Sequence, residues 1–130
     1  MTNRALHRLI FLIVFNGVAL LSWGTTYYVH PELGNDDHSG THLLAPFKSL
    51  KKISTLNLKA GDEILLAAGY TFDGTLRLDG QKGASDHPIR ISSYQWANSL
   101  EDPRAIIDAG QASNGIHLND CSHIIVEHLI

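Results

Sequence analysis

Short apolar runs separated by glycine turns dominate the middle of the chain. Glu63 to Leu66 and Thr75 to Leu78 each hold about four residues, the short end of the range for strands, and Gly61, Gly69 and Gly74 punctuate them. Neither run is long enough for a helix, so the pattern predicts strand, turn and strand. Strands this short cannot bury an apolar face alone, and they must either stack on one another or pair into a sandwich.

Similar units follow as far as the last residue of the sequence. Ile89 and Ile91 alternate with Arg90, which predicts a strand with one buried face and one wet face. The segment 115–130 holds two or three strand patterns with almost no spacer. Corners this tight favour a coil that turns between stacked sheets over a sandwich. Asn119 is predicted to lie at such a corner, with its amide bonded to the backbone of adjacent coils.

One helical pattern precedes most of these strands. Phe47, Leu50 and Ile53 recur every three residues, which predicts an amphipathic helix from Pro46 to Leu56 with the proline in its first turn. The lysines of this segment fall mostly on the opposite side, as on a solvated helix face. A lone helix of this kind would cover the open end of a strand stack, where apolar side chains and unpaired backbone are otherwise exposed.

The first 24 residues carry the features of a secretory signal peptide. Arg4 and Arg8 precede an apolar core over residues 9–21, and small residues follow it. The alternative is an uncleaved membrane anchor, but the core is interrupted and is shorter than the roughly 20 apolar residues of a span. We therefore expect a signal peptide over residues 1–24, a mature chain from Thr25, no stable membrane span after cleavage, and a secreted, periplasmic or cell-surface location.

Charge and cysteine content narrow the possible partners. The formal net charge is −3, and loss of Arg4 and Arg8 with the signal peptide changes it from 10 − 13 to 8 − 13, which is −5. A mildly acidic chain argues against nucleic acid as a partner, because phosphate binding needs clustered Lys and Arg. Cys121 is the only cysteine in the 130 residues, so the chain has no intrachain disulfide and no paired-cysteine zinc signature.

A turn-rich segment carries the one candidate metal site. Asn35, Asp36 and Asp37 follow Gly34 and place hard oxygen donors side by side, as calcium requires. The segment lacks the spaced ligands of an EF-hand loop, and Asn and Asp also make structural turns by bonding their own backbone. Two interpretations stay open, a structural Asx turn and a calcium site at Asp36 and Asp37.

Histidines and the other carboxylates give no clear catalytic set. His117, His123 and His128 could approach one another on consecutive coils and bind zinc or transfer protons. Their intervals are irregular and no carboxylate or cysteine completes a ligand set, so exposed strand or corner positions are the better interpretation. A glycosidase would need two carboxylates that face each other across a groove. The remaining candidates all stand beside turn residues: Asp73, Asp79, Asp108 and Asp120.

Several motifs, taken in order, resemble the N-terminus of secreted proteins of the pectate-lyase-like superfamily. They are Tyr27-Tyr28-Val29, Gly34-Asn35-Asp36, Ser39-Gly40-Thr41, Ala45-Pro46-Phe47-Lys48-Ser49-Leu50, Ala60-Gly61-Asp62-Glu63-Ile64, Pro88-Ile89 and Ser92-Ser93-Tyr94. The resemblance covers residues 26–130. It implies an all-β fold, a right-handed single-stranded parallel β-helix with an N-terminal capping helix, over residues 25–130. In such families the catalytic residues lie on later coils, so we expect them beyond residue 130.

The resemblance also implies a polysaccharide-active protein. The leading hypothesis is a polysaccharide lyase that acts on uronic-acid-containing glycans. The alternative is a non-catalytic β-helix that serves as a surface adhesin or glycan-binding module. No cofactor is evident, although calcium is possible in a full-length protein. Because the strand pattern reaches Ile130 without a closing turn or cap, we expect a C-terminally truncated fragment of a longer protein that has no catalytic activity by itself.

Overall fold

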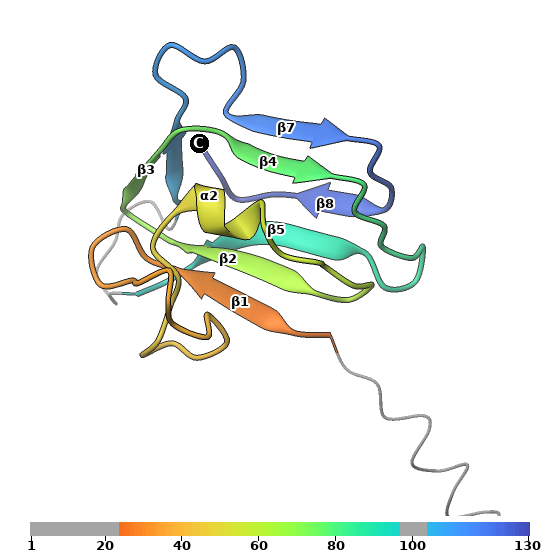
Figure 1. The fold of residues 1–130 in the computed structure, drawn as a ribbon, viewed down its shortest axis with the longest axis horizontal. Coiled ribbons are helices and arrows are strands. Elements are labelled where there is room, and N and C mark those ends of the chain that lie inside the picture. Colours follow the sequence, from red (N-terminus) through yellow and green to blue (C-terminus); the bar gives the residue numbers. More distant parts are fainter. Residues whose placement is uncertain (1–23, 97–103) are drawn as a thin grey trace, which may run out of the picture.

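A computed structural model describes residues 24–96 and 104–130 (Figure 1). The predicted signal peptide, apart from Gly24, lies outside the described residues. Within the described part, no helix is long and apolar enough to cross a membrane.

Strands in three parallel sheets make up almost all regular structure of the described residues. The largest sheet has the order β1-β2-β5-β8, and the two smaller ones are β3-β6 and β4-β7. Every strand pairing in these sheets is parallel. The strands are β1 (Thr26–Val29), β2 (Glu63–Ala67), β3 (Thr71–Asp73), β4 (Leu76–Asp79), β5 (Ile89–Tyr94), β6 (Ile106–Asp108), β7 (Ile116–Asn119) and β8 (Ile124–Val126). The prediction of an all-β fold is confirmed.

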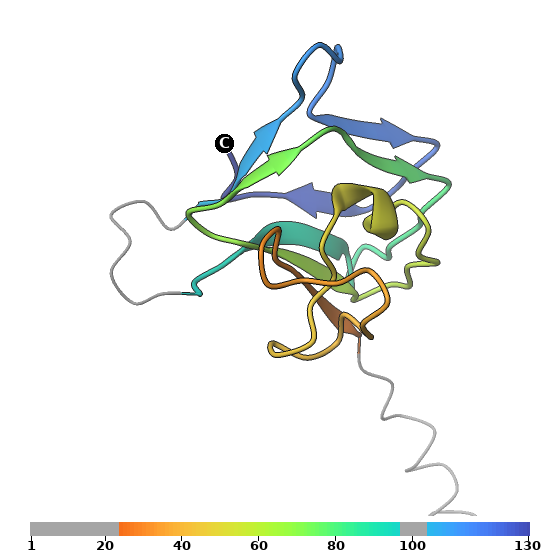
Figure 2. The same ribbon diagram turned by 60° about the vertical axis from the view of Figure 1, so that its left-hand side comes forward.

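The chain visits the three sheets in turn. It passes through β2, β3 and β4, then through β5, β6 and β7, and returns to the first sheet at β8 (Figure 2). Each strand of the second circuit lies parallel to its counterpart in the first. Parallel neighbours require long crossover connections, and here the other two sheets supply them.

The apolar core lies between the sheets. Ile64, Leu66 and Leu76 have no solvent exposure, and Leu78 has 1%. The polar residues between them point outward, since successive side chains of a strand alternate between its two faces. In β5 the predicted alternation is observed, with Ile89 and Ile91 buried on either side of a partly exposed Arg90.

The helix α2 (Leu50–Ile53) is shorter than predicted, and the prediction of a helix from Pro46 to Leu56 is wrong in its extent. Ser49 has extended backbone angles and acts as the N-cap, because its hydroxyl accepts a hydrogen bond from the Lys52 N–H. Phe47 is held in a parallel bridge to the end of β1 and so cannot join the helix. The two buried side chains of α2, Leu50 and Ile53, nevertheless join the core as expected.

Candidate functional site

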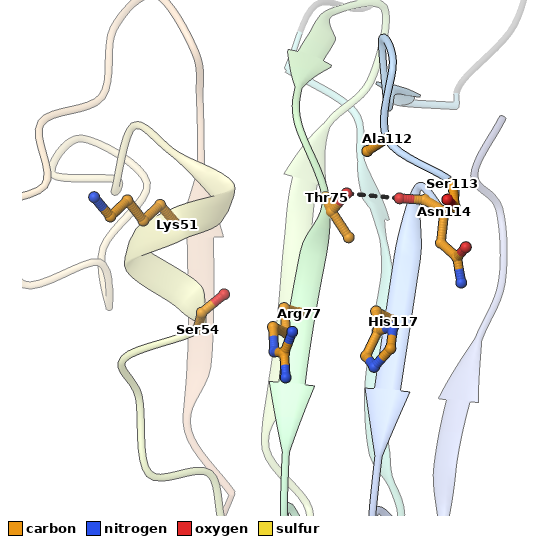
Figure 3. A pocket seen from close by; sticks show the side chains of 8 residues that line it. All are labelled: Lys51, Ser54, Thr75, Arg77, Ala112, Ser113, Asn114 and His117. Atoms are coloured by element: carbon orange, nitrogen blue, oxygen red, sulfur yellow. Dashed lines mark hydrogen bonds between the residues drawn. The ribbon is translucent and has the colours of Figure 1, made fainter.

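A groove of about 470 Å³ runs between α2 and the outer face of the β4–β7 sheet (Figure 3). The loop after β6 closes one end, where the Thr75 hydroxyl donates to the Asn114 carbonyl at 2.6 Å. This volume lies in the usual range for small-molecule sites. The lining residues are Lys51, Ser54, Thr75, Arg77, Ala112, Ser113, Asn114 and His117.

Four polar side chains stand together on the outer face of β4 and β7. Arg77 pairs in register with His117, and Asp79 pairs with Asn119. They point outward because Leu76 and Leu78, which alternate with them on β4, are buried. Parallel strands lie about 4.8 Å apart, and alternate residues along a strand lie about 6.6 Å apart. Arg77, Asp79, His117 and Asn119 therefore form a compact patch, named here the polar square.

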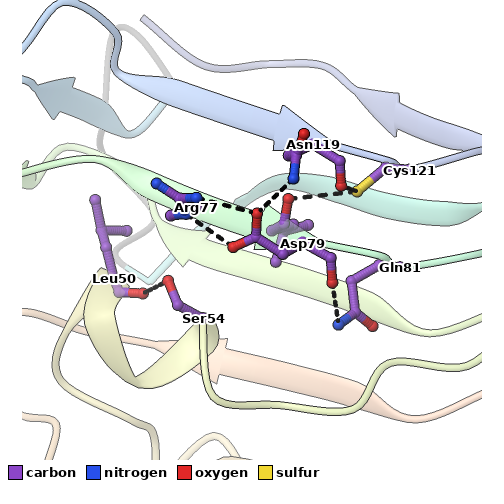
Figure 4. A network of polar contacts seen from close by, with 8 residues as sticks. Leu50, Ser54, Arg77, Asp79, Gln81, Asn119 and Cys121 are labelled. Carbon is purple, nitrogen blue, oxygen red and sulfur yellow. Dashed lines mark hydrogen bonds and ion pairs between the residues drawn. The ribbon is translucent and has the colours of Figure 1, made fainter.

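Hydrogen bonds hold three members of the polar square in fixed positions (Figure 4). Arg77 Nε donates to Asp79 Oδ2 at 2.8 Å, and Arg77 Nη2 donates to Asp79 Oδ1 at 3.2 Å. The Asn119 amide donates to Asp79 Oδ1 at 3.1 Å. The Arg77 hydrogen bond lowers the pKa of Asp79, with further help from the Asn119 bond and from the charges of Arg77 and His117. Asp79 is therefore held as a carboxylate.

The prediction for Asn119 is wrong in the partner of its side chain. The side-chain amide donates to the Asp79 carboxylate on the neighbouring strand β4, whereas a backbone link between the two segments is made by the Gly80 N–H, which donates to the Asn119 carbonyl at 2.8 Å. Cys121 follows directly. Its half-buried thiol lies 3.4 Å from the Leu78 carbonyl oxygen.

The candidate calcium residues lie at the N-terminal side of α2, far along the chain from the polar square. Asp36 Oδ1 accepts the backbone N–H groups of Lys48 and Ser49 at 2.8 and 3.0 Å, and Oδ2 accepts the Ser49 hydroxyl at 2.6 Å. The Asp37 N–H donates to the Asn35 side chain at 2.9 Å, which is the geometry of an Asx turn. Protein donors thus surround Asp36, and calcium at Asp36 and Asp37 stays a prediction.

The three candidate histidines are not brought into a ligand set. His123 and His128 are exposed corner residues with left-handed backbone, φ 53° and 54°, whereas His117 belongs to the polar square. Across the described ranges no three His, Cys, Asp or Glu side chains gather closely enough to hold a metal ion.

Sequence reasoning missed a buried histidine. His30 is fully buried, and its Nδ1 accepts the N–H groups of Glu32 and Leu33 at 3.2 and 3.1 Å. Burial lowers the pKa of His30, and its ring lies against Tyr70 and Trp96. The ring is therefore neutral, and it stabilises the turn after β1 by accepting hydrogen bonds from the backbone of that turn.

The carboxylates of the described residues do not form an evident catalytic pair at the groove. Asp73 and Asp108 are in register on β3 and β6, but both are exposed, and Asp108 Oδ1 accepts the Gly110 N–H at 2.9 Å. Glu127 pairs with Arg90 on the outer face of the large sheet. None of the eight residues that line the groove is acidic. The placement of the catalytic residues beyond residue 130 stays a prediction.

Comparison with known proteins shows a likeness to lacto-N-biosidases. No protein-family profile matches the chain. A lacto-N-biosidase of Bifidobacterium longum subsp. longum is 35% identical over 133 residues, which cover 83% of this chain and 8% of that protein.

Solved structures agree with this relationship. The native crystal structure of a GH136 lacto-N-biosidase from Eubacterium ramulus matches with a TM-score of 0.67 and 26% identity, over 81% of this chain and 20% of that chain. Its selenomethionine derivative matches with a TM-score of 0.68 and 26% identity, over 88% of this chain and 21% of that chain. The chain thus spans about a fifth of the solved relative.

The prediction of a polysaccharide lyase is wrong. The relatives are biosidases of a glycoside hydrolase family, which cleave with water and do not eliminate across a uronic acid. The adhesin or binding-module alternative gains nothing from these relatives. The coarser prediction, kinship with carbohydrate-active proteins, is confirmed.

Proposed function

We propose that this protein acts on glycans as a glycoside hydrolase that cleaves lacto-N-bioside linkages. The observation that carries the proposal is the 35% identity to a lacto-N-biosidase, which extends over 83% of this chain. The two solved structures support it, since they are also lacto-N-biosidases and share the backbone arrangement.

The proposal includes the finer description of the fold. The described residues form coils of a right-handed parallel β-helix of the pectate-lyase-like kind, and the segment 1–24 exports the protein as a signal peptide. Three parallel sheets visited in turn support the helical winding. Stacked coils of this kind give a long outer surface suited to a chain of sugars, an argument that rests on fold-level analogy.

The groove serves glycan binding in this proposal, and bond cleavage takes place elsewhere. Hydrolysis of a glycosidic bond uses two carboxyl groups, one to protonate the leaving oxygen and one to attack or to activate water. The groove lining offers hydroxyl, amide, guanidinium and imidazole groups and no carboxylate. Such groups can orient a sugar, but they do not supply the two carboxyl groups that protonate the leaving oxygen and attack the sugar or activate water.

A chromogenic lacto-N-bioside tests the proposed function. The chain as it stands and the product of the complete reading frame that encodes it are assayed in parallel for release of nitrophenol and of a free reducing disaccharide. Release of both products in the arm with the complete reading frame is the expected result. Absence of release in both arms overturns the proposal. The matching nitrophenyl β-galactoside is the control for unspecific cleavage.

A further inference from the structure

We infer that the polar square on β4 and β7 is a binding subsite for one neutral sugar unit, with the next unit lying in the adjoining groove. The inference rests on the proposed function for the identity of the ligand as a glycan. It adds a place on the molecule and a set of contacts that the likeness to the relatives does not give.

Charge balance favours a neutral ligand over an anionic one. The Arg77 guanidinium is paired with Asp79 at 2.8 Å, so the two charges largely cancel at the surface. Asp79 would also repel a sulfate or carboxylate brought to the same place. Lys51 lines the opposite wall of the groove, but its amine points away from β4 in Figure 3. The polar square is therefore polar without being strongly cationic.

The free hydrogen-bonding atoms of the polar square suit sugar hydroxyls. Arg77 uses Nε and Nη2 on Asp79, which leaves Nη1 as a donor. Asn119 uses its amide nitrogen on the same carboxylate, which leaves its side-chain oxygen as an acceptor. The His117 ring has no hydrogen-bond partner among the described residues and can donate from one nitrogen and accept at the other. A hydroxyl both donates and accepts, so a pair of adjacent hydroxyls can use this mixture fully.

Accessibility and rigidity support a binding role over a purely structural one. The Arg77 and Asp79 side chains are 57% and 49% exposed, so a ligand can reach them. Their mutual hydrogen bonds fix the side chains before binding, which reduces the entropy that a ligand must overcome. A surface ion pair of this exposure contributes little to folding stability.

The groove extends the polar square along the direction of the strands. Arg77 and His117 belong to both, and the groove continues past them toward Thr75 and the loop that carries Ser113 and Asn114 (Figure 3). Ser54, just after α2, lies across the groove from Arg77 on the other wall (Figure 3). A second sugar unit placed here would meet hydroxyl and amide groups on two sides.

The test is a titration of the ¹⁵N-labelled full chain with lacto-N-biose, followed by the shifts of its amide signals. We expect the shifts to concentrate on β4, β7 and the loop over residues 109–115. The variant Arg77→Met keeps the length of the side chain and loses the guanidinium, and it should weaken binding at least about fivefold, the effect of losing a charge-assisted hydrogen bond. The matched control is Arg90→Met, which removes a second outward Arg–carboxylate pair, that with Glu127, and should leave binding unchanged.

Each other outcome overturns the inference. Shifts that fall on the large sheet, or equal weakening by Arg77→Met and Arg90→Met, would place the sugar elsewhere. Shifts produced by sodium sulfate but not by lacto-N-biose would make the polar square an anion site. If the variant Asn119→Ala binds as well as the unchanged chain and has an unchanged unfolding midpoint, the Asn119 side chain does not contact the sugar, which contradicts the inference. Binding of the disaccharide does not depend on hydrolysis, so a failed activity assay and a failed titration can be told apart.

Discussion

The Asp36 carboxylate is expected to be the main polar link between the turn after β1 and the start of α2. It accepts three hydrogen bonds, from the N–H groups of Lys48 and Ser49 and from the Ser49 hydroxyl. The variant Asp36→Ala removes all three acceptors at once. Asp37 gives a matched control one residue away, because it is exposed and its hydrogen bond to Asn35 uses the backbone N–H and not the carboxylate.

The magnitude follows from the number of bonds lost. A hydrogen bond contributes about 1 kcal/mol net, so Asp36→Ala should lower the free energy of unfolding by about 2–3 kcal/mol. For a domain of this size the unfolding midpoint should fall by about 10 °C. Asp36→Asn keeps an oxygen for the two N–H groups and loses the bond from the Ser49 hydroxyl, which should cost about 1 kcal/mol. Asp37→Ala should stay within about 0.5 kcal/mol of the unchanged chain.

The ionisation of the Asp36 carboxylate should also make the folding stability depend on pH in the acid range. Burial opposes its ionisation, but the Ser49 hydroxyl, the N–H groups of Lys48 and Ser49 and the charge of Lys52 together lower the pKa of Asp36. A depressed folded-state pKa gives stability that is present above the unfolded-state value, about 4, and is lost as pH falls through the folded-state value. The pH dependence of stability below about pH 4 should therefore be shallower in Asp36→Asn.

Urea unfolding followed by circular dichroism at several pH values measures all three variants. Equal loss of stability in Asp36→Ala and Asp37→Ala would refute the reasoning, because it would show that the three hydrogen bonds contribute nothing specific. A calcium titration of the same proteins tests the metal site predicted at Asp36 and Asp37. Bound calcium would raise the unfolding midpoint of the unchanged chain and lose that effect in Asp37→Ala.

Three further predictions concern the core, a close backbone contact and a buried phenol. Leu66→Ala should lower the free energy of unfolding by about 3 kcal/mol because the side chain is fully buried, whereas Leu44→Ala, at a 78% exposed position, should change it by less than about 0.5 kcal/mol in urea unfolding. Gly34→Ala should cost about 3 kcal/mol, since a Cβ there would lie 2.1 Å from the Phe47 carbonyl oxygen, and a thermal midpoint equal to that of the unchanged chain would contradict this. Burial, with the neighbouring tyrosines, raises the pKa of Tyr94 to about 12, so an ultraviolet titration should show one phenol that ionises near that pH, and stability should decline as pH rises from 10 toward it.

Local patterns predicted the strands well because alternation reports burial directly. Ile89, Arg90 and Ile91 form one strand with the expected faces, and the glycines at 61, 69 and 74 mark turns with left-handed backbone, φ 86°, 81° and 103°. The helix was harder to bound. Its periodicity persists through Phe47, yet that residue pairs with the end of β1, and only the tertiary structure shows this competition.

The polar square illustrates what one-dimensional reasoning misses. Arg77 and Asp79 stand out as polar residues between buried leucines, which was a usable signal for an outward face. Their partners His117 and Asn119 follow 40 positions later on the adjacent strand. No periodicity within a short window connects the two segments, because the distance between them is set by a full circuit through three sheets.

The sequence by itself determined the all-β class, the position of most strands and the absence of disulfides, since these depend on local alternation, turn residues and cysteine count. It also placed the chain among carbohydrate-active proteins, although the predicted lyase chemistry was wrong, because none of the recognised motifs identifies a reaction. The tertiary structure alone decided where α2 begins, that Asp36 is surrounded by protein donors, and which side chains share the groove. Those features depend on contacts between segments far apart in the chain, and only folding brings them together.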